Sequence, residues 1–265
     1  MNGPPINTVT MSSAFDEAAE LYDAVRPGYP NELFDDIAKL TGLDAGSKVL
    51  EVGCGTGQAT VGFAERGYKV VCVDPGGRLV EVARRKLEGY PVEFIVSRFE
   101  DWVPLESFDL VACGTAWHWV EPEVGYSRAA AALGHGGFIA LFWNLHPTPF
   151  TGFFVDVQSV YSRVVPEWRN PGERLPTAQR IEEASRSVEA SGLFEKPVVR
   201  QYRWKKNYSR DDYLRLLDTY SDHRALPMGV RSRLYREVGR LINEEYRGVV
   251  ERPYLTALFV ARKSP

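Results

Sequence analysis

The chain has 265 residues, of which 44% are hydrophobic and 25% charged, and this is enough for one large α/β domain or two small ones. A formal net charge of -3 gives no general attraction to nucleic acid or to an anionic membrane. No apolar run approaches the roughly 20 residues that span a bilayer, and no spacing of side chains is typical of a metal site. The three cysteines each lie in or beside an apolar run, which predicts reduced thiols in a cytoplasmic protein and no disulfide framework.

The N-terminal part is predicted to contain two helices. Residues 1–12 have no hydrophobic periodicity, and we expect them to form a mobile lead-in. A first helix begins at Ser13, which resembles a capping box with Asp16, and it ends before the prolines that follow Arg26. A second helix is predicted with Asn31 as its N-cap.

Five apolar, β-branched runs follow, most of them separated by helical patterns. The predicted strands are Lys48–Val52, Lys69–Asp74, Val92–Val96, Phe108–Cys113 and Gly137–Trp143, with helices at Gln58–Arg66, Arg78–Leu87 and Tyr126–Leu133. Strands that are apolar throughout and alternate with helices indicate an α/β fold, in which a parallel sheet is covered on both faces.

The alternation breaks after Asn144, and about fifty residues pass before the next predicted strand. The remaining predicted helices are Phe150–Val165, Thr177–Ser191, Arg210–Thr219 and Val230–Tyr246, and the remaining strands are Val198–Trp204 and Tyr254–Ala261. No segment shows the pattern of a separate core. We therefore expect one domain over residues 13–265, with its core in residues 31–146 and 194–265 and a helical lid at about 147–193.

A glycine-rich turn joins the first strand to the next helix. In the run Val49–Gly57 three glycines occupy alternate positions, which removes side chains where the backbone approaches a ligand. The second strand ends in Asp74, whose carboxylate is placed to accept hydrogen bonds from both hydroxyls of a ribose. The glycine spacing differs from the Gly-x-Gly-x-x-Gly of dinucleotide sites, and the chain lacks the Lys-Ser/Thr of a P-loop. A nucleotide-type cofactor is predicted, and the spacing disfavours a nicotinamide-dependent oxidoreductase.

The residues Glu51-Val52-Gly53-Cys54-Gly55-Thr56-Gly57, together with Asp74, resemble the cofactor signature of class I S-adenosylmethionine-dependent methyltransferases. The stretches around Arg26-Pro27 and Ala116-Trp117-His118-Trp119 are similar to the small-molecule group of this family, methyltransferase type 11, which includes trans-aconitate-type enzymes. The resemblance implies a Rossmann-like, mostly parallel seven-stranded sheet with an antiparallel last strand. It further implies helices on both faces, an N-terminal capping helix and a helical lid insertion after the fifth strand.

The same resemblance implies S-adenosyl-L-methionine as cofactor, with S-adenosyl-L-homocysteine as product. Gly53 and Gly55 would meet its methionine and ribose parts, and Asp74 the ribose hydroxyls. The implied cofactor-binding residues are Tyr22, Arg26, Glu51, Gly53, Cys54, Gly55, Asp74, Pro75, Phe99, Glu100, Thr115 and Ala116.

Five of these residues call for comment. Tyr22 and Arg26 resemble residues that close the pocket near the cofactor carboxylate. The acidic residue that the family often places beside the adenine is absent here, so Phe99 and Glu100 are the substitutes. Cys54 is more consistent with a small space-filling residue than with a nucleophile.

The acceptor side is predicted from residues that follow the fourth and fifth strands. His118 is the candidate general base, because open α/β sheets bind ligands at the carboxyl ends of their strands. Trp117 and Trp119 would form an aromatic wall, and Asn144 and His146 would face the same crevice. For each of these residues a structural role remains open: hydrogen bonding for His118, packing for the tryptophans, and turn formation for Asn144 and His146.

The main functional hypothesis is methyl transfer from S-adenosylmethionine to a small-molecule acceptor that carries a carboxylate or a hydroxyl. The basic run Arg200–Lys206 leaves an RNA or protein methyltransferase open, although lysines on an edge strand explain the run as well. A non-catalytic cofactor-binding protein is a further alternative. We expect no membrane partner, no metal, and either a monomer or a homodimer.

Overall fold

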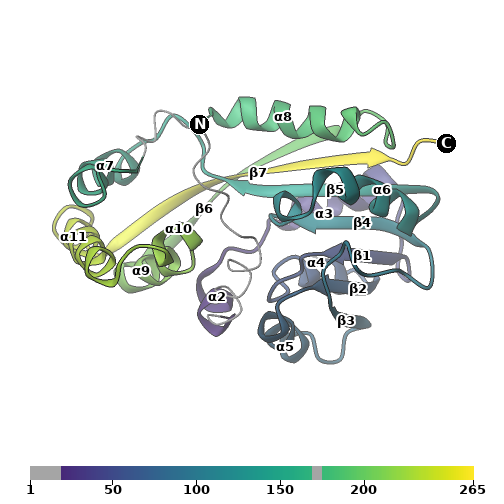
Figure 1. The fold of residues 1–265 in the computed structure, drawn as a ribbon, viewed down its shortest axis with the longest axis horizontal. Coiled ribbons are helices and arrows are strands. Elements are labelled where there is room, and N and C mark those ends of the chain that lie inside the picture. The colour runs from purple at the N-terminus through teal and green to yellow at the C-terminus, as the bar shows by residue number, and fades with distance from the viewer. Residues whose placement is uncertain (1–18, 169–174) are drawn as a thin grey trace.

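The computed structural model describes residues 19–168 and 175–265, and it shows a seven-stranded sheet with helices on both faces (Figure 1). The predicted lead-in and the capping box at Ser13 lie outside the described residues. The strands are β1 (Lys48–Val52), β2 (Lys69–Asp74), β3 (Val92–Val96), β4 (Phe108–Gly114), β5 (Leu133–Leu145), β6 (Val198–Ser209) and β7 (Val249–Arg262). Their order is β3-β2-β1-β4-β5-β7-β6. β7 runs antiparallel to both of its neighbours, β5 and β6, and the other pairs are parallel, so the predicted fold class is confirmed.

The described helices connect these strands in the predicted alternation. They are α2 (Ala19–Val25), α3 (Asn31–Thr41), α4 (Thr60–Ala64), α5 (Gly77–Lys86), the 3₁₀ turn η1 (Trp117–Trp119), α6 (Pro122–Ala132), α7 (Phe153–Val164), α8 (Thr177–Ala190), α9 (Arg210–Asp218), α10 (Ser221–Arg224) and α11 (Met228–Tyr246). One sheet face packs against α3 and α4 through Phe34 and Phe63. The other packs against α6 and α8 through Ala129 and Val188.

Several local predictions differ from the structure: α4 is shorter than expected, α6 and β5 begin earlier, and α10 was not expected. Asn31 is the first residue of α3, and Pro30 occupies the N-cap without a side-chain hydrogen bond, because a proline at that position already has the extended conformation that precedes a helix. Strands β6 and β7 are also longer than predicted, since their pairing continues to Ser209 opposite Val249. Polar residues at the ends of these strands interrupt the hydrophobic pattern, so the pattern did not predict the full length.

The extended halves of β6 and β7 carry a separate group of helices (Figure 1). We call α7, α9, α10 and α11 the helical cap. Its helices pack around their own apolar cluster, which includes Val157, Leu216, Leu234, Val238 and Ile242. The cap thus has a core of its own, contrary to the sequence expectation.

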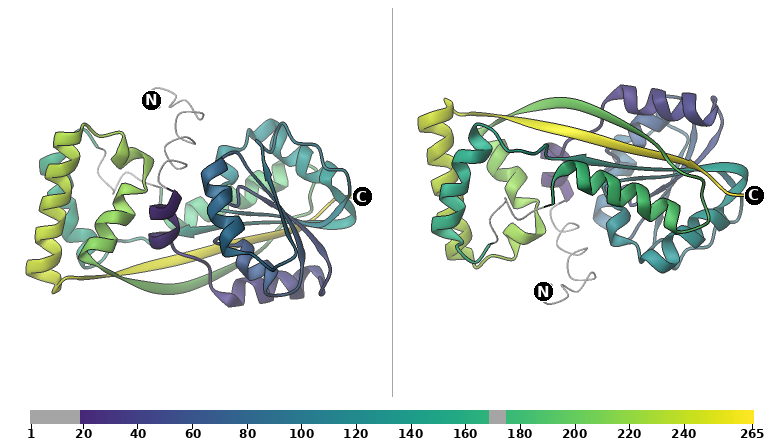
Figure 2. Two further views of the ribbon diagram at one scale, coloured as in Figure 1. Left: turned by 90° about the horizontal axis from the view of Figure 1, so that it is seen from below. Right: turned by 90° about the horizontal axis from the view of Figure 1, so that it is seen from above.

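The lid boundaries expected from the sequence must therefore be corrected. The expected lid was one segment, residues 147–193, but α8 of that segment lies along the sheet, where Ile181 and Val188 join the core (Figure 2). Helices α9 to α11, which had been assigned to the core, join α7 instead. The physical reason is that each helix packs where its apolar face can be buried. The order of the elements in the chain does not show which surface will cover that face.

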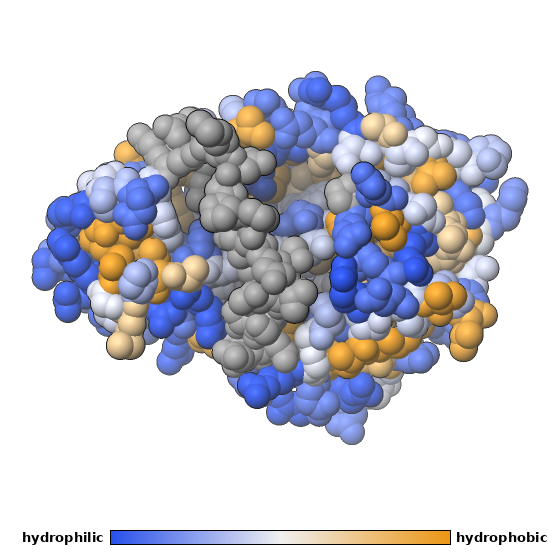
Figure 3. Space-filling model, viewed as in Figure 1, coloured by the Kyte–Doolittle hydropathy of each residue, from blue (hydrophilic) through white to orange (hydrophobic). Residues whose placement is uncertain are grey.

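Helix α2 lies between the cap and the core and contacts both α9 and α5 (Figure 2). Its position agrees with the expected N-terminal capping helix. On the face shown in Figure 3, hydrophobic residues gather only in small groups among hydrophilic ones. No helix in the described part of the chain combines the length and the apolar character that a membrane span requires.

Candidate functional site

A cavity of about 1370 Å³ lies between the carboxyl ends of the central strands and the helical cap. Its walls come from the β1, β2, β4 and β5 ends, from α2, and from α7, α10 and β7. Open α/β sheets bind ligands at this edge, where the strand order reverses. Pockets for a single small ligand commonly measure about 300–1,000 Å³, so this cavity has room for two ligands.

The glycine-rich turn forms the floor of the cavity and demands glycine at two positions for different reasons. Gly53 has φ of +70°, and a Cβ there would lie 2.5 Å from the Cβ of Ala116. Gly55 has φ of +55°, but a Cβ there would meet nothing within 4 Å. Gly53 therefore allows two loops to touch, while Gly55 leaves backbone open to a ligand.

Asp74 holds this turn in place. Its side chain is buried, and its two oxygens accept hydrogen bonds from Gly55 N at 2.9 Å and from Gly76 N at 2.8 Å. Asp74 thus shapes the loop at the cavity wall, where Pro75 also lies.

Glu51 lies behind the same loop and is almost fully buried. Burial and the nearby Asp74 charge together raise the pKa of Glu51 to about 7, against the opposing effect of a hydrogen bond with Thr60. Cys54 also lines the cavity. Its hydrogen bond with Cys72, together with burial, raises the pKa of the Cys54 thiol, which makes a thiolate nucleophile unfavourable.

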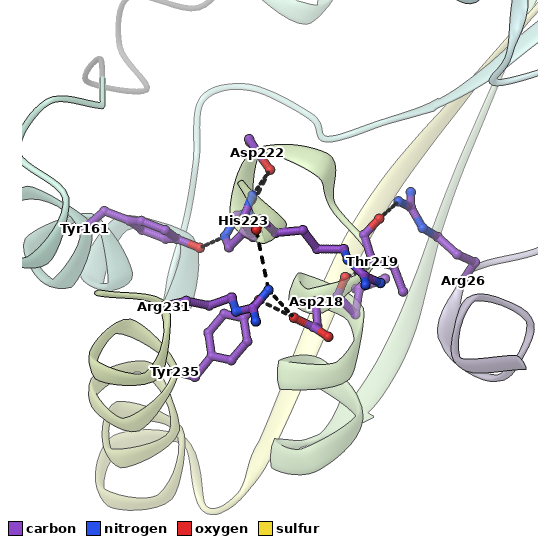
Figure 4. A network of polar contacts seen from close by, with 10 residues as sticks. Arg26, Tyr161, Asp218, Thr219, Asp222, His223, Arg231 and Tyr235 are labelled. Carbon is purple, nitrogen blue, oxygen red and sulfur yellow. Dashed lines mark hydrogen bonds and ion pairs between the residues drawn. The ribbon is translucent and has the colours of Figure 1, made fainter. Parts of the chain in front are cut away.

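Arg26 reaches the cavity from the end of α2. Its guanidinium lies over the rings of Tyr22 and Tyr220, at 4.7 and 4.6 Å from their centroids. One of its Nη atoms donates to the carbonyl of Thr219 at 2.7 Å (Figure 4). Its Nε is buried and has no hydrogen-bond partner among the described residues. Arg26 therefore brings a positive charge to the cavity wall.

The loop after β4 carries Thr115, Ala116 and His118 along the cavity wall. Thr115 has φ of +57°, a strained value for a β-branched residue. Its hydroxyl shares a 2.8 Å hydrogen bond with Tyr29, a residue of the cavity that the sequence analysis did not single out. The tyrosine thus holds the loop in the conformation that brings Ala116 against Gly53.

His118 lies at the cavity wall with its ring 4.8 Å from that of Trp119. Although the residue is exposed, partial burial of the ring by its neighbours lowers the pKa of His118, and the Arg180 cation adds to the effect. The ring is therefore neutral near pH 7, as a general base must be.

Trp117 does not line the cavity, in contrast to its expected place in an aromatic wall. Its side chain is buried and packs against Tyr126 and Phe99, with ring centroids 5.2 and 6.2 Å away. The 3₁₀ turn explains the difference, because it directs successive side chains to opposite environments. Phe99 and Glu100 do line the cavity, and the Glu100 carboxylate forms an ion pair with Arg98.

Asn144 and His146 both line the cavity, but the side chain of Asn144 is hydrogen-bonded within the protein at both its nitrogen and its oxygen. Its amide donates to Gly28 O at 2.9 Å, and its carbonyl oxygen accepts from the Thr256 hydroxyl at 2.6 Å. These bonds join the segment after α2 to β5 and β7. The ring of His146 packs against Phe154 at 4.2 Å, at the border between sheet and cap.

The far wall of the cavity belongs to the cap and was missed by the sequence analysis. Within it, His223 accepts or donates a 2.8 Å hydrogen bond with Tyr161 and another with Asp222 (Figure 4). Tyr220, Arg252 and Tyr254 complete this wall. The only available signal was the density of aromatic residues in these segments, which is equally typical of a core.

Comparisons with known proteins show a similarity to methyltransferases. Residues 49–137 match the sequence profile of a family described as a methyltransferase domain. An uncharacterized methyltransferase of Mycobacterium bovis is 36% identical over 136 residues, which cover 51% of this chain and 53% of the relative. One from Schizosaccharomyces pombe is 24% identical over 83% of this chain and 84% of its own length. The chain thus aligns with about half the length of the mycobacterial relative.

A solved structure extends the likeness in fold to the whole chain. It is that of an S-adenosylmethionine-dependent methyltransferase from Thiobacillus denitrificans in complex with S-adenosyl-L-homocysteine. Its TM-score is 0.52 at 19% identity, and the comparison covers 100% of both chains. At this level of identity the likeness concerns the fold.

Proposed function

We propose that the chain is a class I S-adenosylmethionine-dependent methyltransferase and that it transfers a methyl group from S-adenosylmethionine to a small-molecule acceptor. The observation that carries the proposal is the glycine-rich turn, which meets Asp74 on the floor of a cavity large enough for a donor and an acceptor. The acceptor carries a carboxylate or a hydroxyl group.

The residues of the floor fit this cofactor. Gly55 leaves open space where any side chain would project, and the carboxylate of Asp74 at the same wall is a suitable group for ribose hydroxyls. The buried, unpartnered Nε of Arg26 suits the carboxylate of the cofactor's methionine part. Tyr22, Pro75, Phe99 and Glu100 complete the proposed cofactor set.

The bound cofactor supplies a methyl group on a positively charged sulfur, which is already an activated leaving group. The protein's contribution is then to position the acceptor and to exclude water. We propose that Thr115 and Ala116 support the reacting end, and that His118 accepts the proton of an acceptor that must lose one. The lowered pKa of His118 supports this role.

The alternative of a nucleic-acid substrate is not favoured by the contacts of the basic run. Strand β6 is at the sheet edge, and Lys205 forms an ion pair with Glu251 at 2.6 Å. The ammonium of Lys206 lies near the carbonyl oxygens of Val25 and Arg26, at 3.4 and 3.5 Å. These cations are used within the protein, which supports a small acceptor.

We further propose that core and cap act as one unit, because residues of both line the same cavity. The three cysteines are free and buried, which supports a reducing, cytoplasmic location. The oligomeric state, monomer or homodimer, is a question for light scattering.

Calorimetry with S-adenosylhomocysteine and with NAD tests the cofactor. We expect binding of the former alone, and binding of NAD without the homocysteine analogue would contradict the proposal. Asp74→Asn should weaken binding by about 1–3 kcal/mol, because it replaces a charged acceptor. Asp109→Asn is the matched control, since Asp109 also accepts a backbone N–H, that of Lys48, at 2.8 Å but outside the cavity.

A labelled-methyl assay on a metabolite extract, followed by mass identification of the product, tests the transfer itself. Labelled product in the small-molecule fraction is expected. Cofactor binding without labelling of any fraction would identify a non-catalytic cofactor-binding protein.

A further inference from the structure

Arg252 lies in the half of β7 that enters the cap, and it lines the cavity. Residues 252, 254 and 256 of a strand point to the same face, so Arg252 shares its face with Tyr254 and Thr256. Thr256 bonds to Asn144 at the sheet end of the cavity. Arg252 is four residues further along the strand, which places its backbone roughly 13 Å towards the cap.

The surroundings of the Arg252 guanidinium are aromatic. It lies over the rings of Tyr254, Phe154 and Tyr220, at 5.1, 5.5 and 6.0 Å from their centroids. Its Nε is buried and has no hydrogen-bond partner among the described residues, and the ion pairs found in that part of the chain do not include it. Burial lowers the pKa of Arg252, but the neighbouring tyrosine side chains outweigh this effect and raise it. Tyr213 also forms a side-chain hydrogen bond with Arg252.

This arrangement differs from that of a structural arginine. A buried guanidinium remains charged, and such a charge is costly unless an anion compensates it. Arg210 also has a buried Nε without a partner, but its guanidinium forms a 2.9 Å ion pair with Asp211 and lies outside the cavity. Arg252 has aromatic faces and an open cavity in place of a carboxylate.

The neighbouring cation does not account for this site. Arg26 also lies over the Tyr220 ring, and under the proposed function its counter-ion is the carboxylate of the cofactor. Arg98 and Arg180 also line the cavity, and Arg98 is paired with Glu100 and Glu121. The ion pairs of the described residues give Arg252 no carboxylate, and an anionic group on the acceptor would supply one.

We propose that Arg252 binds a carboxylate of the methyl acceptor and so determines which acceptors are used. A single guanidinium forms two parallel hydrogen bonds with a carboxylate, whereas a phosphate dianion calls for more positive charge. Phe154 and Tyr254 pack beside the apolar body that carries this carboxylate. The assignment rests on the proposed function, because it takes the second ligand to be the acceptor.

The test compares matched acids and amides, which differ in charge but not in shape. Calorimetry in the presence of saturating S-adenosylhomocysteine measures the binding of a panel of carboxylates, from butanoate to 3-phenylpropanoate, and of the corresponding primary amides. For the acids that bind, we expect an affinity about tenfold or more above that of the amide. If no acid in the panel is preferred to its amide, the assignment is wrong.

Variants locate the preference. Arg252→Gln should abolish it while the affinity for S-adenosylhomocysteine stays unchanged, and Arg252→Lys should retain part of it because the positive charge remains. Arg210→Gln, the matched control, should leave the preference intact. If Arg252→Gln folds and still prefers acids, the assignment is wrong. If Arg252→Gln does not fold, an undiminished acid preference in Arg252→Lys would overturn the assignment.

The two hypotheses fail in different ways. Absence of S-adenosylhomocysteine binding by the wild-type protein would remove the proposed function itself. Normal binding of that product without any acid preference would remove only the role of Arg252. Circular dichroism and thermal unfolding of each variant separate a lost contact from a lost fold.

Discussion

At the scale of single residues, the glycine-rich turn separates a packing requirement from a binding requirement. Gly53→Ala must both adopt φ near +70° and push a Cβ to 2.5 Å from Ala116. We expect a loss of about 1–2 kcal/mol for the left-handed backbone and of about 1–3 kcal/mol more for overpacking. Urea unfolding measures the sum.

Gly55→Ala bears the backbone cost alone, because its Cβ meets nothing within 4 Å. Its main effect should be weaker binding of S-adenosylhomocysteine, since the methyl group occupies ligand space. Gly229→Ala, in α11 and without a positive φ or a close neighbour, is the control and should stabilise the protein slightly. If Gly53→Ala and Gly55→Ala change unfolding and ligand binding to the same extent, the distinction between a packing role for Gly53 and a binding role for Gly55 is wrong.

The proton-accepting role of His118 has a specific pH signature. Because its pKa is lowered, the neutral base persists below the ordinary histidine value near 6.5, and kcat/KM should fall only at more acidic pH. Arg180→Gln removes a cation that disfavours the protonated ring, so the acid limb should move to higher pH. His118→Ala should lower kcat by a factor of about 100 or more and abolish this limb; an unchanged pH profile in both variants would exclude the role.

At the scale of elements, the cap combines segments that are distant in sequence, and this decides which of them respond to a ligand. Helices α7 and α10 contribute Phe154, Tyr161 and His223 to the cavity wall, whereas α11 contributes to the cap core through Leu234 and Val238. Helix α8 packs on the sheet through Ile181 and Val188.

Hydrogen exchange with and without S-adenosylhomocysteine measures this response. We expect slower exchange in α7 and α10 on binding, and little change in the sheet-packed residues of α8. Uniform slowing over residues 147–190, with none in α10, would instead support the contiguous lid expected from the sequence.

The same contrast explains how much of the structure the sequence could predict. The strands β1, β2 and β3 and the turn at Gly53 were predicted with their correct bounds, because hydrophobic runs and glycines act locally. The positions of Tyr220 and Arg252 were not predicted, because they depend on the pairing of β6 with β7. That pairing joins residues that are distant in sequence, such as Lys206 and Arg252, which are 46 residues apart. Trp117 was misplaced for a related reason, because a pattern does not specify which side of a 3₁₀ turn faces the core.

At the scale of the whole molecule, ligand binding should stabilise the fold as a unit. A ligand present at a hundred times its dissociation constant adds about 2.7 kcal/mol to the free energy of unfolding. Because core and cap share the cavity, we expect one unfolding transition that moves to higher temperature with S-adenosylhomocysteine. Two transitions, of which only one moves, would show that the cap unfolds independently.

Strand β7 runs without interruption from the sheet end of the cavity to the cap, and Thr256, Tyr254 and Arg252 lie along one of its faces. Extended backbone cannot lengthen, so the separation between these three side chains' attachment points is set by about 3.4 Å per residue. The strand therefore fixes the distance between the two ends of the cavity wall, and an acceptor held at Arg252 is selected by its length as well as by its charge. Inserting two residues into β7 between Thr256 and Arg252 would increase this distance and keep both side chains on the same face.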